Sequence, residues 1–142
     1  MLQIENINQY YGQSHILWDL SLNVKEGTCG CLIGRNGVGK TTLLKCITGI
    51  LPVCDGVIEF NGNNINKLST EARARAGIGF VPQGREIFPL LTVEENLKIS
   101  LGARSDKLNT IPTQIYELFP VLKEMKNRRG GDLSGGQQQQ LA

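Results

Sequence analysis

The spacing of apolar residues changes along the chain at about residue 84. Before this point, short apolar runs of strand-like character are separated by turn residues such as glycine, asparagine and proline. After it, apolar residues recur at the spacing of an amphipathic helix. The pattern therefore predicts a mixed α/β first part and a mainly helical second part.

The first part begins with two predicted strands, over residues 2–11 and 15–24, which are joined by a turn at Gly12. The second of these strands alternates apolar and polar positions, with the apolar ones at Trp18, Leu20, Leu22 and Val24. Shorter apolar runs predict three further strands, over residues 28–33, 57–60 and 78–81.

Two helices are predicted in the same part of the chain. The first covers residues 41–50, and its apolar positions follow helical spacing at Leu43, Leu44, Ile47 and Ile50. The second is a short helix that Ser69 or Thr70 can cap and that runs to Arg75. Strands and helices thus alternate, as in an α/β fold.

Three helices are predicted in the second part. Thr92 is the expected N-cap of a helix over residues 93–101, and Glu95 would complete a capping box. Pro112 opens the next helix, whose apolar stripe is expected to pack against a core or a partner helix and consists of Ile115, Leu118 and Phe119. The last predicted helix covers residues 138–142.

The most specific chemical signal lies at residues 34–41, Gly-Arg-Asn-Gly-Val-Gly-Lys-Thr, which match the phosphate-binding pattern G-x-x-x-x-G-K-T. The glycines let the backbone turn tightly, and the amides point at an anion from the N-terminus of the following helix. Lys40 would place a cation on the β- and γ-phosphates, and the Thr41 hydroxyl would bind Mg²⁺. The predicted nucleotide contacts are Gly34, Asn36, Gly37, Gly39, Lys40, Thr41 and Thr42.

A second candidate anion site lies at residues 133–137, Leu-Ser-Gly-Gly-Gln, directly before the last predicted helix. It would combine a serine hydroxyl with free amides at a helix N-terminus. Alone, such a segment is ordinary loop chemistry, and its place after a phosphate loop makes it specific. The predicted contacts are Ser134, Gly135, Gly136 and Gln137.

Composition narrows the class of protein. The chain has 142 residues, of which 40% are hydrophobic and 20% charged, as expected for one soluble globular domain. A net charge of +2 gives no general reason to bind nucleic acid or a membrane surface. No segment is apolar enough to insert into a bilayer, and no secretory signal is evident, so we expect a cytosolic protein.

The cysteines and the single histidine suggest no metal site. The four cysteines are expected to be free thiols, because cytosolic proteins rarely form disulfides. Cys29 and Cys31 match no usual zinc spacing and are predicted to be small core residues. His15 has no metal or nucleophile partner in the sequence and is predicted to be structural.

Taken together, these motifs resemble those of the ATP-binding subunits of ABC transporters. Segments 34–41 and 133–137 match the family's phosphate loop and signature. Gln83 matches the family's Q-loop, which implies that it approaches Mg²⁺ and the attacking water in a catalytic role. Tyr11 matches the aromatic that stacks on adenine, with Tyr10 as the substitute if the register slips by one. Without the other motifs, Gln83 would be a surface glutamine and Tyr11 an aromatic packed on its strand.

The resemblance implies an α/β fold of the P-loop NTPase class, an ABC ATPase core with an N-terminal antiparallel β subdomain and the start of a helical subdomain. Residues 1–84 would form the core, and residues 85–142 the Q-loop exit and helical signature subdomain. It also implies Mg-ATP as cofactor, a second ATP-binding subunit on which the signature acts in trans, and transmembrane permease subunits. Such a subunit is cytoplasmic and peripheral on the membrane, with a permease contact that we expect at Arg85, Phe88 and Leu91.

The resemblance extends to the branch that imports branched-chain amino acids and urea. Segments 34–36 and 82–97 carry it, and segment 11–20 is most similar to the urea-type subunit. We therefore expect an ATPase subunit that powers uptake of urea or a related small polar nutrient. The alternatives are a branched-chain amino acid importer subunit and a nucleotide-binding module without turnover. The modest charge argues against a relative that acts on nucleic acid or ribosomes.

Several parts of the family pattern have no counterpart among these 142 residues: the acidic Walker B strand, the catalytic glutamate after it, the D-loop and the switch histidine. Phosphoryl transfer requires a positioned water and a metal held from both sides. The chain alone is therefore predicted to bind ATP without hydrolysing it. Unpaired strand edges and exposed apolar faces are expected to make it poorly stable or prone to associate.

Overall fold

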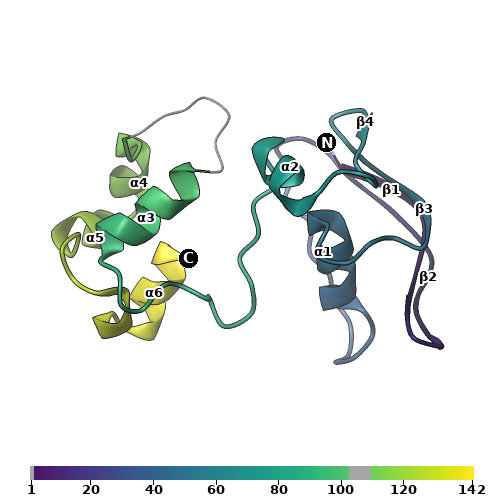
Figure 1. Cartoon of the computed structure of the whole chain (residues 1–142), viewed down its shortest axis with the longest axis horizontal. Coiled ribbons are helices and arrows are strands. Elements are labelled where there is room, and N and C mark those ends of the chain that lie inside the picture. Colours follow the sequence, from purple (N-terminus) through teal and green to yellow (C-terminus); the bar gives the residue numbers. More distant parts are fainter. Residues whose placement is uncertain (1, 103–109) are drawn as a thin grey trace. The chain divides into compact units, whose positions relative to one another are not determined.

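The computed structural model describes residues 2–102 and 110–142, and the chain divides into two compact units, Met1–Ala74 and Arg75–Ala142. The first unit holds a β-sheet and two helices, and the second is helical (Figure 1). The elements thus change from mixed α/β to helical, in the predicted order, and the second unit begins at Arg75, before the predicted change at about residue 84.

The sheet of the first unit has four antiparallel strands in the order β2-β1-β3-β4 (Figure 1). Its strands are β1 (Leu2–Tyr11), β2 (Ser14–Val24), β3 (Asp55–Phe60) and β4 (Asn63–Asn64). The central strand β1 pairs with two neighbours at once, so that Ile4 lies opposite both Leu22 and Ile58. The predicted strands at residues 2–11, 15–24 and 57–60 are thus confirmed.

The predicted alternation of β2 is wrong at Trp18, whose side chain is 70% exposed. The reason is a bulge: Ile7 pairs with Leu20, but Gln9 pairs with Leu17, so β2 carries one extra residue. Asp19, within the bulge, has a φ of 40°. The extra residue moves the buried position from Trp18 to Leu17, because strand side chains alternate with a period of two.

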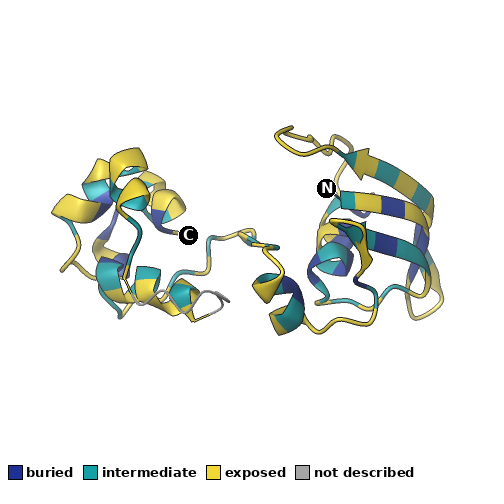
Figure 2. Ribbon diagram, turned by 90° about the horizontal axis from the view of Figure 1, so that it is seen from above, coloured by how far each residue is buried: buried dark blue, intermediate teal, exposed yellow. Residues whose placement is uncertain are grey.

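One helix of the first unit, α1 (Lys40–Thr48), begins within the phosphate-loop motif and ends at Gly49, whose φ is 79°. The other, α2 (Thr70–Arg75), is capped by the Ser69 hydroxyl, which accepts from the Ala72 amide at 3.3 Å. Both confirm predicted helices. Figure 2 shows buried residues along the strands of the sheet and in the helix beside it. The buried apolar residues of this unit are Ile4, Ile7, Leu17, Leu43, Cys46, Ile58 and Ile65.

Two predicted strands do not form. Segments 28–33 and 78–81 pair with no strand in the described part of the chain, and Ile33 is 91% exposed. Cys29 and Cys31 are exposed as well, so the prediction that they belong to the core is wrong, and Cys46 is the buried cysteine. An apolar run becomes a strand only when neighbours satisfy its backbone groups, which its own residues cannot do.

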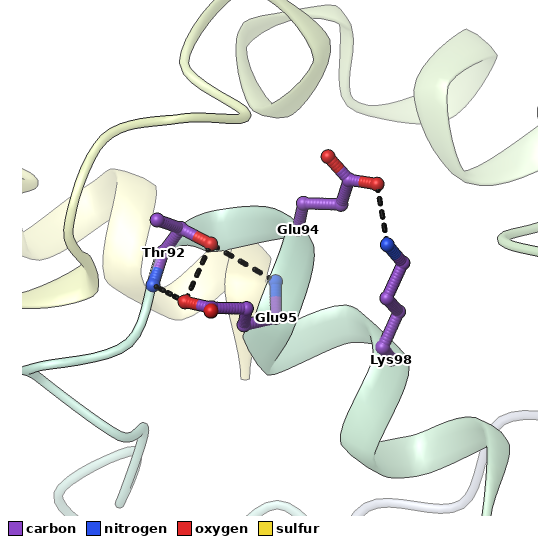
Figure 3. Close-up of polar contacts among 4 residues, drawn as sticks. All are labelled: Thr92, Glu94, Glu95 and Lys98. Carbon is purple, nitrogen blue, oxygen red and sulfur yellow. Dashed lines mark hydrogen bonds and ion pairs between the residues drawn. The ribbon is translucent and has the colours of Figure 1, made fainter.

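The second unit packs short helices around one small core. The helices are α3 (Val93–Leu101), α4 (Thr113–Leu118), α5 (Pro120–Glu124), η1 (Gly130–Asp132) and α6 (Gly135–Leu141). Four buried residues form the core: Val93, Leu122, Leu133 and Leu141. The predicted capping box of α3 is confirmed, because the Thr92 hydroxyl accepts from the Glu95 amide and Glu95 accepts from the Thr92 amide (Figure 3).

The apolar stripe predicted for the helix after Pro112 is confirmed only in part. Ile115 and Phe119 are half-buried, and Phe119 packs against the core, but Leu118 is 71% exposed. The helix is interrupted at Phe119, where φ is −129° and ψ is 72°, and Pro120 opens α5. Proline disfavours the helical conformation in the residue before it, which breaks the regular stripe.

Candidate functional site

The phosphate-loop motif adopts the backbone that its glycines permit. Gly37 and Gly39 have φ values of 84° and 99°. These values lie in the left-handed region, which residues other than glycine rarely adopt. A Cβ added at Gly39 would lie 2.8 Å from Leu17 Cδ2. Gly39 is also the N-cap of α1, and no side chain caps that end of the helix. The first turn of α1 therefore keeps amide donors for a ligand.

These donors lie in the same segment as the polar side chains that the motif supplies. Among the described residues, no backbone hydrogen bond outside the helices uses an amide of residues 35–41. Lys40 Nζ donates to the carbonyls of Gly34 and Arg35, at 2.8 and 2.7 Å, and so holds the loop closed on itself. Asn36 and Thr41 are exposed, whereas Thr42 is buried. Amides, an ammonium group and a hydroxyl at one loop form a donor set that suits a phosphate group.

The two candidate adenine aromatics differ in their surroundings. Tyr10 stacks on His15 with ring centroids 4.1 Å apart, and His15 stacks on Trp18 at 3.7 Å. Tyr11 ends β1 with its side chain 47% exposed and makes no ring contact with another described residue. One face of Tyr10 is thus covered by His15, whereas no ring among the described residues covers Tyr11.

His15 has the structural role predicted for it. Its Nε2 lies 2.8 Å from Asn8 Oδ1, and Asn8 Nδ2 donates to Asp19 Oδ1 at 2.8 Å. Because the Asn8 amide nitrogen faces an acceptor, Oδ1 is the accepting atom, and His15 Nε2 carries the proton. Among the described residues, no group of three or more histidines, cysteines and acids could hold a metal ion.

The Ser-Gly-Gly motif of the second unit begins a helix earlier than predicted, because α6 starts at Gly135 and Ser134 is its N-cap. Ser134 Oγ accepts from the Gln137 amide at 3.4 Å, and Gln137 Oε1 accepts from the Ser134 amide at 2.9 Å. The prediction that the helix begins at residue 138 is therefore wrong. The capping-box spacing of serine and glutamine was the signal that could have located its start.

Gln83 lies in a loop of the second unit with an exposed side chain. The next two residues, Gly84 and Arg85, have φ values of 95° and 72°. The Arg85 side chain turns to α6 and donates from Nη1 to Gln138 Oε1 at 3.2 Å. No motif predicted this role for Gln138, and its place one residue after the signature was the available signal. Tyr11 and residues 34–42 belong to the first unit, and Gln83 and residues 133–137 to the second.

A family model described as ABC transporter matches residues 17–142 of the chain. The chain is 41% identical over 144 residues to the high-affinity branched-chain amino acid transport ATP-binding protein BraG of Pseudomonas aeruginosa. It is 37% identical over 143 residues to LivF of Archaeoglobus fulgidus, a probable branched-chain amino acid transport ATP-binding protein. Each alignment includes 100% of this chain and 61% of the relative, so the chain spans about three fifths of these proteins.

Solved structures show the same fold. A nucleotide-free ATP-binding cassette from an ABC transporter superposes with a TM-score of 0.81 at 30% identity, covering 99% of this chain and 62% of that one. A bacterial ABC transporter cassette solved as a dimer superposes with a TM-score of 0.79 at 28% identity, covering 99% and 66%. The chain thus has the fold of part of such a cassette, with an antiparallel sheet, a phosphate loop and a helical unit.

Proposed function

The chain belongs to the ABC transporter family, and on that premise we propose that it is the ATP-binding part of an importer subunit that binds Mg-ATP. The observation that carries the proposal is the loop at residues 34–41. Its glycines adopt left-handed conformations, its helix has no side-chain cap and its lysine lies over the loop. A segment whose only function was to form a turn would need neither Lys40 nor a helix that lacks a side-chain cap.

Most of the predicted nucleotide contacts have a role in this proposal. The amides of the loop and Lys40 hold the β- and γ-phosphates, and Lys40 exchanges its two carbonyl partners for phosphate oxygens. Tyr11 stacks on adenine. Bound Mg²⁺ would neutralise phosphate charge, with the exposed Thr41 hydroxyl as its protein ligand and Gln83 as a second candidate. Ser134, Gly135, Gly136 and Gln137 act on a nucleotide held by a second subunit.

Replacing Lys40 by alanine tests the nucleotide site. Lys40→Ala removes the cation over the loop and should abolish Mg-ATP binding, measured by isothermal titration calorimetry. Lys45→Ala is the matched control, because Lys45 lies in the last turn of the same helix and loses the same charge away from the loop. Unchanged affinity in Lys40→Ala would contradict the site assignment.

The chain by itself is proposed to bind ATP without turnover. Residues 1–142 contain the phosphate loop and one candidate metal hydroxyl, but no residue matches the family's catalytic glutamate. Phosphate release over time, compared with that of a version extended to the full length of its relatives, tests this. Sustained turnover by residues 1–142 that Lys40→Ala abolishes would contradict it.

The cargo of the proposed importer is a small nutrient, either a branched-chain amino acid or urea. The names of BraG and LivF support a branched-chain amino acid, whereas segment 11–20 was the basis for urea. Reconstitution with candidate permeases and binding proteins separates the two. The correct cargo, leucine or urea, should stimulate ATP hydrolysis by the complete complex when its binding protein carries it.

We propose two kinds of protein partner, a second ATP-binding subunit and the transmembrane permease subunits. A related cassette was solved as a dimer, which supports the first. In the described part of the chain, no helix combines the length and apolar character needed to cross a bilayer. At the proposed permease contact Phe88 is 52% exposed and Leu91 is half-buried, while Arg85 already contacts α6.

A further inference from the structure

A side chain from the loop after Gln83 lies against the first turn of α6. Arg85 Nη1 donates to Gln138 Oε1 at 3.2 Å, and a Cβ added at Gly135 would lie 3.3 Å from Arg85 Nη2. Gln138 continues the connection, because its Nε2 donates to the Gly130 carbonyl at 3.3 Å. Arg85 is therefore linked both to the signature helix and to the turn that precedes it.

The backbone that presents Arg85 is held in an unfavourable conformation. Arg85 and Glu86 have φ values of 72° and 52°, in the left-handed region that residues other than glycine rarely adopt. Consecutive residues of this kind persist where the surrounding structure holds them. Backbone bonds contribute, from Arg85 to the Pro82 carbonyl at 3.1 Å and from Glu86 to the Gly84 carbonyl at 2.9 Å. The Arg85 side chain adds its bond to Gln138.

Charge attraction within the unit does not explain where Arg85 lies. The structure shows an ion pair between Glu94 and Lys98, and no carboxylate within residues 2–102 and 110–142 forms an ion pair with Arg85. A cation beside the first turn of a helix is opposed by the helix dipole. The planar guanidinium instead forms a directed hydrogen bond and contacts α6, so shape and hydrogen-bond direction determine where it lies.

The far end of the same loop is also fixed. Phe88 donates its amide to Asn96 Oδ1 at 2.8 Å, and Asn96 Nδ2 donates back to the Phe88 carbonyl at 3.0 Å. Gly130 donates its amide to the Leu91 carbonyl at 2.8 Å. The loop is therefore held in place at Phe88 and Leu91. If it moves near Gln83, the Arg85 side chain transmits that movement to α6.

We propose that Arg85 and Gln138 are a positioning pair, which holds the signature turn at Ser134 in register with the loop that carries Gln83. The inference rests on the proposed function and extends it, since it identifies the contact by which the state of the Gln83 loop reaches the signature. Arg85 acts through α6 in this role and does not itself touch the nucleotide.

Hydrogen exchange of the α6 amides tests the pair without nucleotide. Arg85→Met should speed exchange at the Gln137 and Gln138 amides roughly three- to tenfold, which is the scale of one lost hydrogen bond. Gln138→Met should do the same, and the double variant should add little, because the two side chains act as a unit. Arg128→Met is the matched control, an exposed arginine of the same unit, and should leave these amides unchanged.

A swap of the two side chains separates positioning from a general loss of stability. Arg85→Gln combined with Gln138→Arg rebuilds the hydrogen bond in the opposite direction and should restore exchange to within about twofold of the original chain. If Arg85→Met does not fold, Arg85→Lys gives the comparison, because lysine keeps the charge without the planar fork. Unchanged exchange in the single variants, or a folded swap that restores nothing, would overturn the proposal.

A second experiment tests whether the Arg85–Gln138 pair contributes to nucleotide-dependent assembly. The Mg-ATP concentration that gives half-maximal self-association, followed by light scattering, should rise several-fold in Arg85→Met. The affinity of the dilute monomer for Mg-ATP should stay unchanged, because Lys40 and Thr41 are intact. If the original chain binds no Mg-ATP, the proposed function fails, and the exchange experiment still decides whether the pair exists.

Discussion

At the residue scale, Gly56 shows how a close backbone approach restricts a position. Its φ is 92°, and an added Cβ would lie 2.5 Å from the carbonyl oxygens of both Glu5 and Asn6. Gly62 has a φ of 75°, but nothing lies within 4 Å of its Cβ position. A side chain at Gly62 would therefore cause backbone strain alone, whereas one at Gly56 would cause both strain and steric overlap.

Alanine substitution at both glycines measures that difference. Gly62→Ala carries strain alone and should lower the free energy of unfolding by about 1 kcal/mol. Gly56→Ala adds a clash with backbone atoms, which cannot rotate away, and should cost about 3 kcal/mol or more. Urea unfolding monitored by circular dichroism provides the values, and equal losses at the two sites would contradict this account.

Arg73 is a second residue whose role depends on its surroundings. It is 1% exposed, and its guanidinium donates to the backbone carbonyls of Cys46, Ile47, Asn66 and Leu68 at 2.7–3.1 Å. Two of these carbonyls belong to the C-terminal turn of α1, where a cation is favoured by the helix dipole. Arg73 thus joins α2 to the helix that begins at the phosphate loop.

Removing the guanidinium should destabilise the first unit. Arg73→Met leaves buried carbonyls without donors, which should lower the free energy of unfolding by about 3 kcal/mol. Arg73→Lys keeps the charge but not the fork and should recover only part of the loss. Arg75→Met is the control, because Arg75 is an exposed residue of the same helix. Similar stabilities of Arg73→Met and Arg75→Met would refute the role.

At the element scale, the capping box of α3 makes helix stability depend on pH. Hydrogen bonds from the Thr92 amide and then from its hydroxyl lower the pKa of Glu95 from its ordinary value of 4.5 (Figure 3). A lowered pKa in the folded state means that the ionised carboxylate favours folding. This contribution is complete above pH 4.5 and is lost as the pH falls through the lower folded-state value.

Two variants test the box. Thr92→Ala should lower the free energy of unfolding by about 1 kcal/mol at neutral pH. Glu95→Gln keeps a hydrogen-bond acceptor without the charge, so it should be less stable than the original chain near pH 7 and equally stable at about pH 2. A stability difference that persists unchanged in acid would contradict the assignment, and melting curves across this range measure it.

Features that depend on residues close together in the sequence were predictable, and features that depend on distant residues were not. The capping boxes of α3 and α6 each span four residues, and the first was predicted from that spacing alone. The bulge that exposes Trp18 depends on the register of β2 against β1, which is a non-local pairing. The contact between Arg85 and Gln138 joins residues 53 positions apart, and no local pattern specifies it.

At the scale of the whole molecule, each unit leaves large apolar side chains exposed. Ile33 in the first unit is 91% exposed, and Leu90 and Leu118 in the second are 79% and 71% exposed. Strand β2 lies at the edge of the sheet, so within the described residues one of its sides has no neighbouring strand. Exposed apolar residues and a long edge strand both favour association between chains.

We therefore expect the chain to self-associate as its concentration rises. Light scattering should detect species heavier than the 15.6 kDa monomer, and heating should give a broad transition. Leu118→Gln should reduce association without destabilising the fold, because that side chain is mostly in solvent. A concentration-independent monomer with one sharp, cooperative melting transition would contradict this expectation.

Local patterns in the sequence were enough to predict the motif of the phosphate loop, the helix after it and three of the strands, because each depends on residues a few positions apart. The family followed from several such local motifs taken together. Packing between distant segments decided the rest. It left residues 28–33 without a strand neighbour, turned Trp18 outward, buried Arg73 among carbonyls and brought Arg85 to α6. These features depend on which backbone and side-chain groups satisfy one another across the fold, and spacing along a sequence does not specify such partners.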